Sequence, residues 1–268
     1  MDAPTPATPL GDPVLVTDEG RVRRIVMNRG RERNLLTAEM IDALSEALDA
    51  PQARVIVIAA QGPAFCAGHD MKAMAARQGD ADGGRAWFEA LFARCGDFMT
   101  RIATIPQPVI AEIHATAVAA GCQLVAACDL AIASEAARFG TTGVSFGLYC
   151  STPAVPLTRT VAAKHAAELL MTGDVVDAAH ALRIGLVNRV VSAERLTEET
   201  MGLAAHIARK SAAVLALGKR AVAAQAGLPL PQAYACATAA MVENLLLEDG
   251  REGLAAFAEK RPANWRDR

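Results

Sequence analysis

The chain has few aromatic residues and almost no net charge. Only 4% of its 268 residues are Phe, Trp or Tyr, and the formal net charge is -2 at pH 7. A nucleic-acid-binding domain usually carries a basic face, and single-stranded partners also need aromatic side chains on which bases stack. No apolar run approaches the roughly 20 residues that span a bilayer. We therefore predict neither a nucleic-acid partner nor a membrane span.

Metal-binding and disulfide patterns are also missing. The six cysteines form no Cys-x-x-Cys pair, and no His/Cys cluster has the spacing of a zinc site. We expect buried, reduced thiols and no metal ion. Residues 1–13 contain neither the basic and apolar regions of a secretory signal nor the arginines of a mitochondrial presequence. They predict a short disordered arm and a cytoplasmic location.

The patterns that are present alternate between strand and helix. Residues 54–60 and 109–113 are continuous apolar runs, typical of strands buried on both faces. Stretches with helical apolar spacing precede and follow them. This alternation predicts an α/β core over residues 14–205, with right-handed crossovers. From about residue 153 the patterns are almost wholly helical, and residues 206–268 are expected to form a C-terminal helical region.

Two loops of small residues follow the two apolar strands. The first is residues 65–72 (FCAGHDMK) and the second is residues 117–123 (AVAAGCQ). In open α/β sheets ligands lie beyond the carboxyl ends of strands, and small residues let a ligand approach the backbone closely. A helix opening near Gly121 adds unpaired N–H groups and the positive end of its dipole. Donors from the two loops could converge on one oxygen, as an oxyanion hole requires.

These loops resemble the two signatures of the crotonase (enoyl-CoA hydratase/isomerase) superfamily. The string AFCAGHDMKAM resembles the first signature, and HATAVAAGCQLVAACD resembles the second. Three further strings, MNRGRERNLLTAEM, ELLMTGDVVDAAHALRIGLVNRVV and GLAAFAEKRPANW, extend the similarity in the right order from about residue 14 to the C-terminus. The string GLYCSTPAVPLTR is most similar to the subgroup called enoyl-CoA hydratase domain-containing protein 3.

The resemblance implies a spiral of ββα units, with a C-terminal helical region that forms trimers or a dimer of trimers. It implies an acyl-CoA thioester bound between the loops, with coenzyme A as part of the substrate and no separate cofactor. The backbone N–H groups of His69 and Ala120 would form the oxyanion hole. Further substrate contacts are implied at Arg31, Ala67, Gly68, Asp70, Met71, Lys72, Gly121, Tyr149, Cys150 and, from a neighbouring subunit, Lys260.

The three basic residues among these substrate contacts have a second interpretation. Arg31 stands near the family position that meets the adenine, while Lys72 and Lys260 are candidates for contacts with the phosphates. All three could equally be solvated surface charges, as most Lys and Arg side chains are.

The sequence departs from the family at both acid–base positions. A hydratase of this family uses two glutamates, and Gln123 and Gly143 stand at their positions. Adding water to a double bond needs a base and an acid. A glutamine amide does not titrate near neutrality, and glycine has no side chain. We therefore expect slow or absent ordinary hydration, with the backbone donors retained.

Several side chains could substitute for the missing carboxylates. The imidazole of His69 could titrate near neutrality, or only its backbone matters. Asp70 is expected to hold its loop by accepting backbone N–H bonds. Glu112 is unusual in an apolar strand and could pair at a subunit contact. Cys150 could act as a nucleophile or serve as a packing thiol.

Three hypotheses about function remain open at this point. The first is a hydratase/isomerase-family enzyme, a lyase, that stabilises a thioester enolate with other acid–base groups. The second is a non-catalytic module that binds acyl-CoA or only assembles. The third and weakest is thioester hydrolysis through Cys150.

Overall fold

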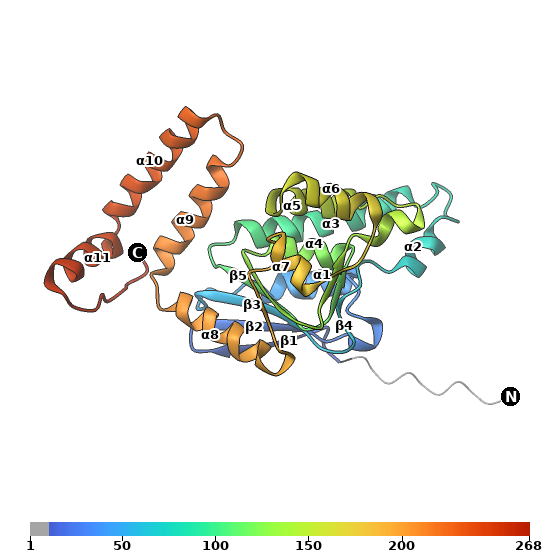
Figure 1. The fold of residues 1–268 in the computed structure, drawn as a ribbon, viewed down its shortest axis with the longest axis horizontal. Helices are drawn as coiled ribbons and strands as arrows, with labels where there is room; N and C mark the ends of the chain where they lie inside the picture. Colours follow the sequence, from blue (N-terminus) through green and yellow to red (C-terminus); the bar gives the residue numbers. More distant parts are fainter. Residues whose placement is uncertain (1–10) are drawn as a thin grey trace.

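Two sheets form the framework of residues 11–268, the part of the chain that the computed structural model describes (Figure 1). The larger sheet has the order β1-β2-β3-β5-β7-β10 and the smaller has the order β4-β6-β8-β9. The strands of the larger sheet are β1 (Val14–Glu19), β2 (Val22–Met27), β3 (Val55–Ala60), β5 (Val109–Ile113), β7 (Leu130–Ser134) and β10 (Arg189–Val191). Those of the smaller are β4 (Ala64–Cys66), β6 (Thr116–Val118), β8 (Arg138–Gly140) and β9 (Val176–Asp177).

Pairing is parallel in the centre of each sheet and antiparallel at one edge. β1 and β2 form an antiparallel hairpin, and β9 runs antiparallel to β8; the other neighbours pair in parallel. The apolar runs at residues 54–60 and 109–113 became β3 and β5, and every residue of β5 is buried. Parallel pairing brings the carboxyl ends of β3 and β5 to the same edge, where both small-residue loops begin.

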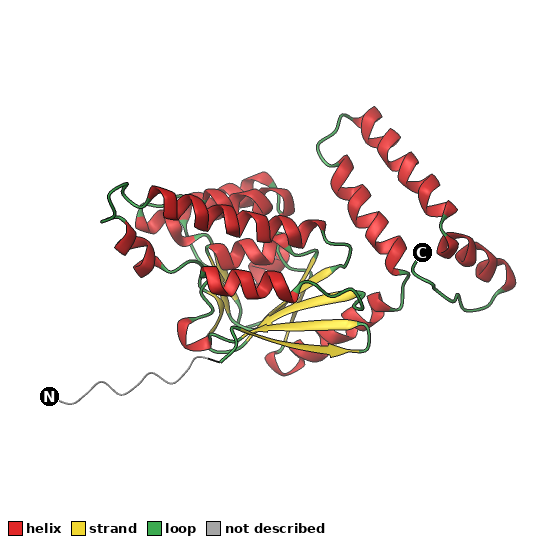
Figure 2. Cartoon of the chain, turned by 180° about the vertical axis from the view of Figure 1, so that it is seen from behind, coloured by secondary structure: helices red, strands yellow, loops and turns green. Residues whose placement is uncertain are grey.

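Helices cover both faces of the larger sheet (Figure 2). Alternate side chains of β3 face opposite sides: Val55 and Val57 pack against α8 (Leu196–Ala208), whereas Ile56 and Ile58 join the main core. The helices on the main-core side are α1 (Ala38–Ala47), α2 (Met71–Arg77), α3 (Arg85–Thr104), α4 (Ala120–Ala127), α5 (Ser151–Thr160), α6 (Ala163–Thr172) and α7 (Ala178–Arg183). Short 3-10 segments are η1 (Gly30–Glu32), η2 (Thr142–Phe146) and η3 (Ala193–Arg195). The predicted α/β class is confirmed.

Three helices leave the core as an arm. They are α9 (Ala212–Gln225), α10 (Leu230–Leu246) and α11 (Glu248–Glu259), drawn in orange and red in Figure 1. The predicted boundary between residues 205 and 206 falls inside α8, which still packs on the sheet. Within residues 11–268 no helix is long and apolar enough to cross a bilayer.

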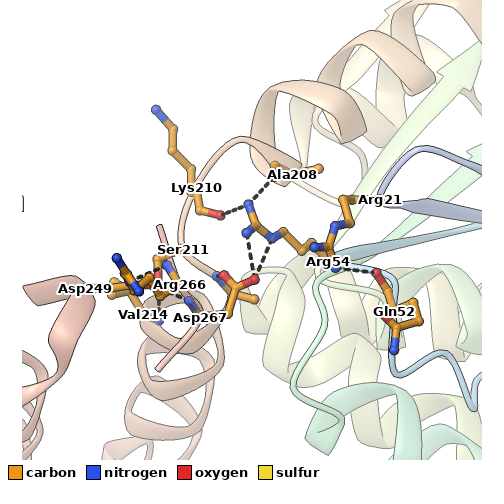
Figure 3. Close-up of polar contacts among 11 residues, drawn as sticks. Arg21, Gln52, Arg54, Ala208, Lys210, Ser211, Val214, Asp249, Arg266 and Asp267 are labelled. Atoms are coloured by element: carbon orange, nitrogen blue, oxygen red, sulfur yellow. Dashed lines mark hydrogen bonds and ion pairs between the residues drawn. The ribbon is translucent and has the colours of Figure 1, made fainter. Parts of the chain in front are cut away.

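The end of the chain ties this arm to the core (Figure 3). The guanidinium of Arg54 donates twice to Oδ2 of Asp267, at 2.6 and 3.0 Å, and also to the carbonyls of Ala208 and Lys210. The other carboxylate oxygen of Asp267 accepts the N–H of Ala212 at 2.8 Å, at the start of α9. The carboxylate of Asp267, 213 residues after Arg54 in the chain, therefore joins the start of β3 to the first turn of α9.

The carboxylate of Glu112 also finds its partner inside the chain. Its Oε1 accepts from Arg24 at 2.6 Å and from Thr197 of α8 at 3.0 Å, and the residue is 4% exposed. The expectation of pairing at a subunit contact was wrong, because β2 lies beside β3 and presents Arg24 across the sheet. Through Thr197 the same carboxylate joins α8 to the sheet.

Candidate functional site

The two small-residue loops touch each other at two glycines. Gly68 has a φ of +91°, and a Cβ built there would lie 3.0 Å from the Cβ of Ala119 and 3.3 Å from the nitrogen of Ala120. A Cβ at Gly121 would overlap the carbonyl oxygen of Cys66 and lie 2.9 Å from its Cβ. Both contacts need glycine, because any side chain would push the loops apart.

Ala119, which has an unusual backbone conformation, sets the direction of the first N–H of α4. Ala119 has φ 51° and ψ -119°, a conformation rare for residues other than glycine. Its N–H donates to Gly140 at 2.9 Å, and its carbonyl accepts from Gln123 at 3.1 Å. The N–H of Ala120 then finds no acceptor within residues 11–268, and the same holds for the N–H of His69 in the facing loop. Strain that the surroundings hold in place is typical of functional sites.

The imidazole of His69 is held from two sides. Its Nδ1–H donates to the carbonyl of Leu36 at 2.9 Å, and the ring meets Phe92 of α3 edge-on at 5.6 Å. The remaining nitrogen, Nε2, is buried and no protein group within residues 11–268 pairs with it. Burial disfavours the charged imidazolium and lowers the pKa of His69, against a smaller opposing contribution from the Leu36 carbonyl.

The two positions of the usual glutamates differ in how they are filled. Gln123 on α4 is 3% exposed, and its Oε1 is buried without a donor among the described residues. A Cβ at Gly143 would overlap the carbonyl oxygen of Leu148 and lie 2.8 Å from Sγ of Cys150. The 143–150 loop is closed by a 3.0 Å bond from the N–H of Leu148 to the carbonyl of Gly143. This loop occupies the space that a second carboxylate would need.

An apolar cleft of about 630 Å³ borders the first loop at Met71. α2 contributes Met71 and Met74, α3 contributes Phe88 and Phe92, and the segment before α5 contributes Phe146, Leu148 and Tyr149. None of the lining residues is charged. Pockets of this size and composition take small-molecule ligands, and methionines adapt to irregular apolar shapes.

The family follows from the comparisons with known proteins. Residues 18–268 match the family model described as enoyl-CoA hydratase/isomerase. The chain belongs to this family.

Relatives and solved structures of this family resemble the chain along most of its length. It is 43% identical to enoyl-CoA hydratase domain-containing protein 3, mitochondrial, of Danio rerio, over 94% of this chain and 86% of that protein. A crystal structure of the human protein of that name has a TM-score of 0.88, 41% identity and coverage of 94% of this chain and 100% of that one. A crystal structure of an enoyl-CoA hydratase from Mycobacterium smegmatis has a TM-score of 0.88, 43% identity and coverage of 96% and 99%. These confirm the predicted superfamily, subgroup and spiral fold.

The same names correct the predicted location. The vertebrate relatives, from fish, frog and mammals, are each described as mitochondrial, so the expectation of a cytoplasmic protein was wrong. That expectation depended on the composition of residues 1–13, and residues 1–10, most of the predicted disordered arm, lie outside the described residues. Residues 11–13 lie against the core, where the carbonyl of Pro13 accepts the N–H of Asn28 at 2.7 Å.

The remaining predicted residues lie either near the loops or in the C-terminal arm. Near the loops, Asp70 caps α2 by accepting from Lys72 and Ala73 at 2.9 and 3.0 Å, which is the loop-holding contact the sequence predicted. The side chains of Arg31 and Lys72 are exposed, and no acceptor pairs with them within residues 11–268. Lys260 ends α11 in the arm, on an element that does not line the cleft.

The thiol of Cys150 lies under the cleft wall. The residue is 8% exposed, burial raises the pKa of its thiol, and the N–H of Gly143 donates to the sulfur. A raised pKa keeps the thiol protonated at neutral pH, which disfavours a nucleophilic role.

Sequence reasoning missed a cluster of possible metal ligands. His165 and Glu168 of α6 and His180 of α7 bring their donor atoms within 4.8 Å of one another. They are three and fifteen residues apart, so only the fold unites them. Arg183 donates to Nδ1 of His180 at 2.7 Å and places a positive charge beside the cluster, which opposes the binding of a cation.

Proposed function

We propose that the protein binds an acyl-CoA thioester and stabilises its enolate with the backbone N–H groups of His69 and Ala120. The observation that carries this proposal is a pair of backbone donors without acceptors, where the loops meet beside an apolar cleft. When a thioester enolises, negative charge develops on the carbonyl oxygen, and fixed donors stabilise that charge. The N-terminal end of α4 adds the positive end of its dipole to the same point.

Ordinary hydration of an enoyl-CoA is expected to be slow or absent. Gln123 does not titrate, and Gly143 has neither a side chain nor room for one. The family's water-activating pair is therefore missing, while the groups that hold an enolate oxygen remain. This combination favours a reaction that passes through an enolate without adding water.

The second candidate function is acyl-CoA binding without turnover, and the same two replacements favour it. One experiment separates the two candidates. A saturated acyl-CoA is titrated by calorimetry and then incubated with the protein in D₂O, and replacement of its α-protons by deuterium is followed by NMR. Binding with α-proton exchange supports the enolate function; binding without exchange supports the passive module. Absence of binding contradicts both.

The apolar cleft predicts that affinity depends on chain length. Each methylene buried contributes about 0.8 kcal/mol, so the Kd of saturated acyl-CoA esters should tighten about fourfold per added methylene until the cleft is full. Calorimetry across an even-numbered series measures this. The control is a matched ester with a terminal carboxylate, which should lose most of the gain because no charged side chain lines the cleft. Equal affinity for all chain lengths would contradict this assignment of the acyl site.

The coenzyme A end is proposed to contact exposed basic side chains. Arg31 on η1 is proposed to meet the adenine, and Lys72 at the start of α2 to meet the phosphates; both side chains are exposed. Lys260 is assigned to a neighbouring subunit, because α11 lies in the arm rather than beside this chain's own cleft.

The arm is proposed to mediate self-association as a trimer or a dimer of trimers. Its helices expose large apolar side chains that the core does not cover: Val222, Leu230, Tyr234, Met241, Val242, Leu245, Leu246, Leu254 and Phe257. Apolar patches of this kind mark interaction surfaces. Sedimentation is expected to give a mass three or six times that of the 28.0 kDa chain. Leu246→Asp should lower the measured mass toward that of a single chain. A monomeric wild-type protein would contradict this.

A further inference from the structure

We infer that the imidazole of His69 is the base of this site: Nε2 removes a proton from the α-carbon of the bound thioester. The backbone N–H of the same residue holds the carbonyl oxygen. The inference rests on the proposed function, and it names the group that replaces the missing glutamates.

The hydrogen bond to Leu36 sets the tautomer. A neutral imidazole has one donor and one acceptor nitrogen. Because Nδ1–H donates to the Leu36 carbonyl at 2.9 Å, the lone pair lies on Nε2. A base whose ring is oriented by a third group is the recurring arrangement at sites of proton transfer.

The ring lies behind Phe92, one of the residues that line the acyl cleft. It contacts Phe92 edge-on, and Phe92 lines the cleft together with Met71 and Met74. Met71 is only two residues from His69, at the start of α2. The imidazole is thus separated from the apolar space proposed for the acyl chain by one side chain, that of Phe92.

Only one of the buried unpaired side-chain atoms at the site can take up a proton. Within residues 11–268 three such atoms occur, on His69, Gln123 and His114. A glutamine amide is not a base near neutrality. His114 bonds through Nε2 to the carbonyl of Gly62 at 2.8 Å and lies between β5 and β6, outside both loops. Buried polar atoms are seldom left unpaired, and each needs an explanation.

The surroundings of His69 carry no charge that would keep it protonated. Its own loop carries Cys66 and Asp70, and the segment before α1 carries Arg33. The helices around it carry Glu39, Asp42 and Glu46 on α1, Lys72 and Arg77 on α2, and Arg85, Glu89, Arg94, Cys95, Asp97 and Arg101 on α3. Most of these carboxylates are engaged: Asp70 caps α2, Glu39 pairs with Arg29, Asp42 with Arg94 and Glu89 with Arg85. None of the charged groups contributes to the pKa shift of His69, which comes from burial and the Leu36 carbonyl. Burial raises the pKa of the Cys66 thiol to about 12 and that of Cys95 to about 11, so both stay neutral.

Every proton and electron pair in the transfer is accounted for by groups at the site. The Cα–H bond breaks and its proton bonds to the Nε2 lone pair, which gives an imidazolium. The electron pair of that bond forms the double bond between Cα and the carbonyl carbon, and the carbonyl π pair moves to oxygen. The enolate oxygen accepts from the N–H groups of His69 and Ala120. In D₂O the imidazolium exchanges its proton with solvent and returns a deuteron to the α-carbon.

The test is α-proton exchange of octanoyl-CoA in D₂O, measured by NMR for wild type and His69→Gln. Glutamine keeps the backbone N–H and a side-chain donor for Leu36, but it cannot act as a base. We expect exchange to fall by about 10²- to 10⁴-fold, with Kd by calorimetry changed little. His114→Gln, which alters another buried imidazole with an unpaired nitrogen, is the matched control and should exchange as wild type does.

Two further measurements keep the inference falsifiable if His69→Gln folds poorly. Imidazole added to His69→Ala should restore part of the exchange. In wild type, exchange should decline with acid only below the ordinary histidine pKa of about 6.5, because burial lowers the pKa of His69 and protonation removes the base. Wild-type exchange that survives unchanged in folded His69→Gln, or that already declines on acidification well above the ordinary histidine pKa of about 6.5, overturns the inference alone. Wild type that binds without exchange overturns the enolate function as well.

Discussion

Replacing Ala120 by proline is expected to slow α-proton exchange in a bound acyl-CoA by about 10²- to 10³-fold. Proline removes the N–H that we assign to the enolate oxygen, and loss of one such donor typically has this effect. Ala120 is the first residue of α4, where proline is tolerated because its N–H has no partner inside the helix. The preceding residue has ψ -119°, outside the α region that a following proline disfavours.

The control places a proline at the same position of another helix. Ala163 is the first residue of α6, it is exposed, and it follows a residue in extended conformation. Ala163→Pro should leave both exchange and acyl-CoA affinity unchanged. If Ala120→Pro folds, binds acyl-CoA and still exchanges at the wild-type rate, the N–H of Ala120 is not a donor to the enolate.

Replacing Gly121 by alanine is expected to lower exchange about 100-fold and to destabilise the fold. The added methyl would overlap the carbonyl of Cys66, at the contact that holds the two loops together. Inserting a methyl into a packed contact costs about 1–3 kcal/mol, and moving catalytic groups by about 1 Å can cost about 10²-fold in rate. Thermal unfolding and the exchange assay measure the two effects separately.

A second glycine provides the matched control for this substitution. Gly202 lies inside α8, and a Cβ there would meet nothing within 4 Å. Gly202→Ala should leave exchange unchanged and raise the free energy of unfolding by up to about 1 kcal/mol, because alanine favours the helix. Wild-type exchange in Gly121→Ala would mean that the close approach of the loops is not needed.

Much of the fold could be predicted from local patterns. The apolar runs that became β3 and β5 need only periodicity and length to be recognised. Thr37 is a residue type that favours helix starts, and it caps α1 by accepting from Met40 at 3.2 Å. Parallel pairing then brings the ends of these strands, and so both loops, to the same edge of the sheet.

The contacts that give the site its chemistry could not be predicted in this way. His69 is fixed by Leu36, 33 residues earlier, and by Phe92 on a different helix. Gly143 is closed off by the carbonyl of Leu148, which local sequence presents only as a turn. The bond between Arg54 and Asp267 joins residues 213 positions apart. Such pairings depend on how elements pack, and no local period encodes them.

The most direct test of the account is a crystal structure with a saturated acyl-CoA bound. We expect the thioester oxygen to lie about 2.7–3.1 Å from both backbone nitrogens, those of His69 and Ala120. The α-carbon should lie within reach of Nε2 of His69, and the acyl chain should follow the cleft past Phe92. A thioester oxygen directed away from those two nitrogens would contradict it.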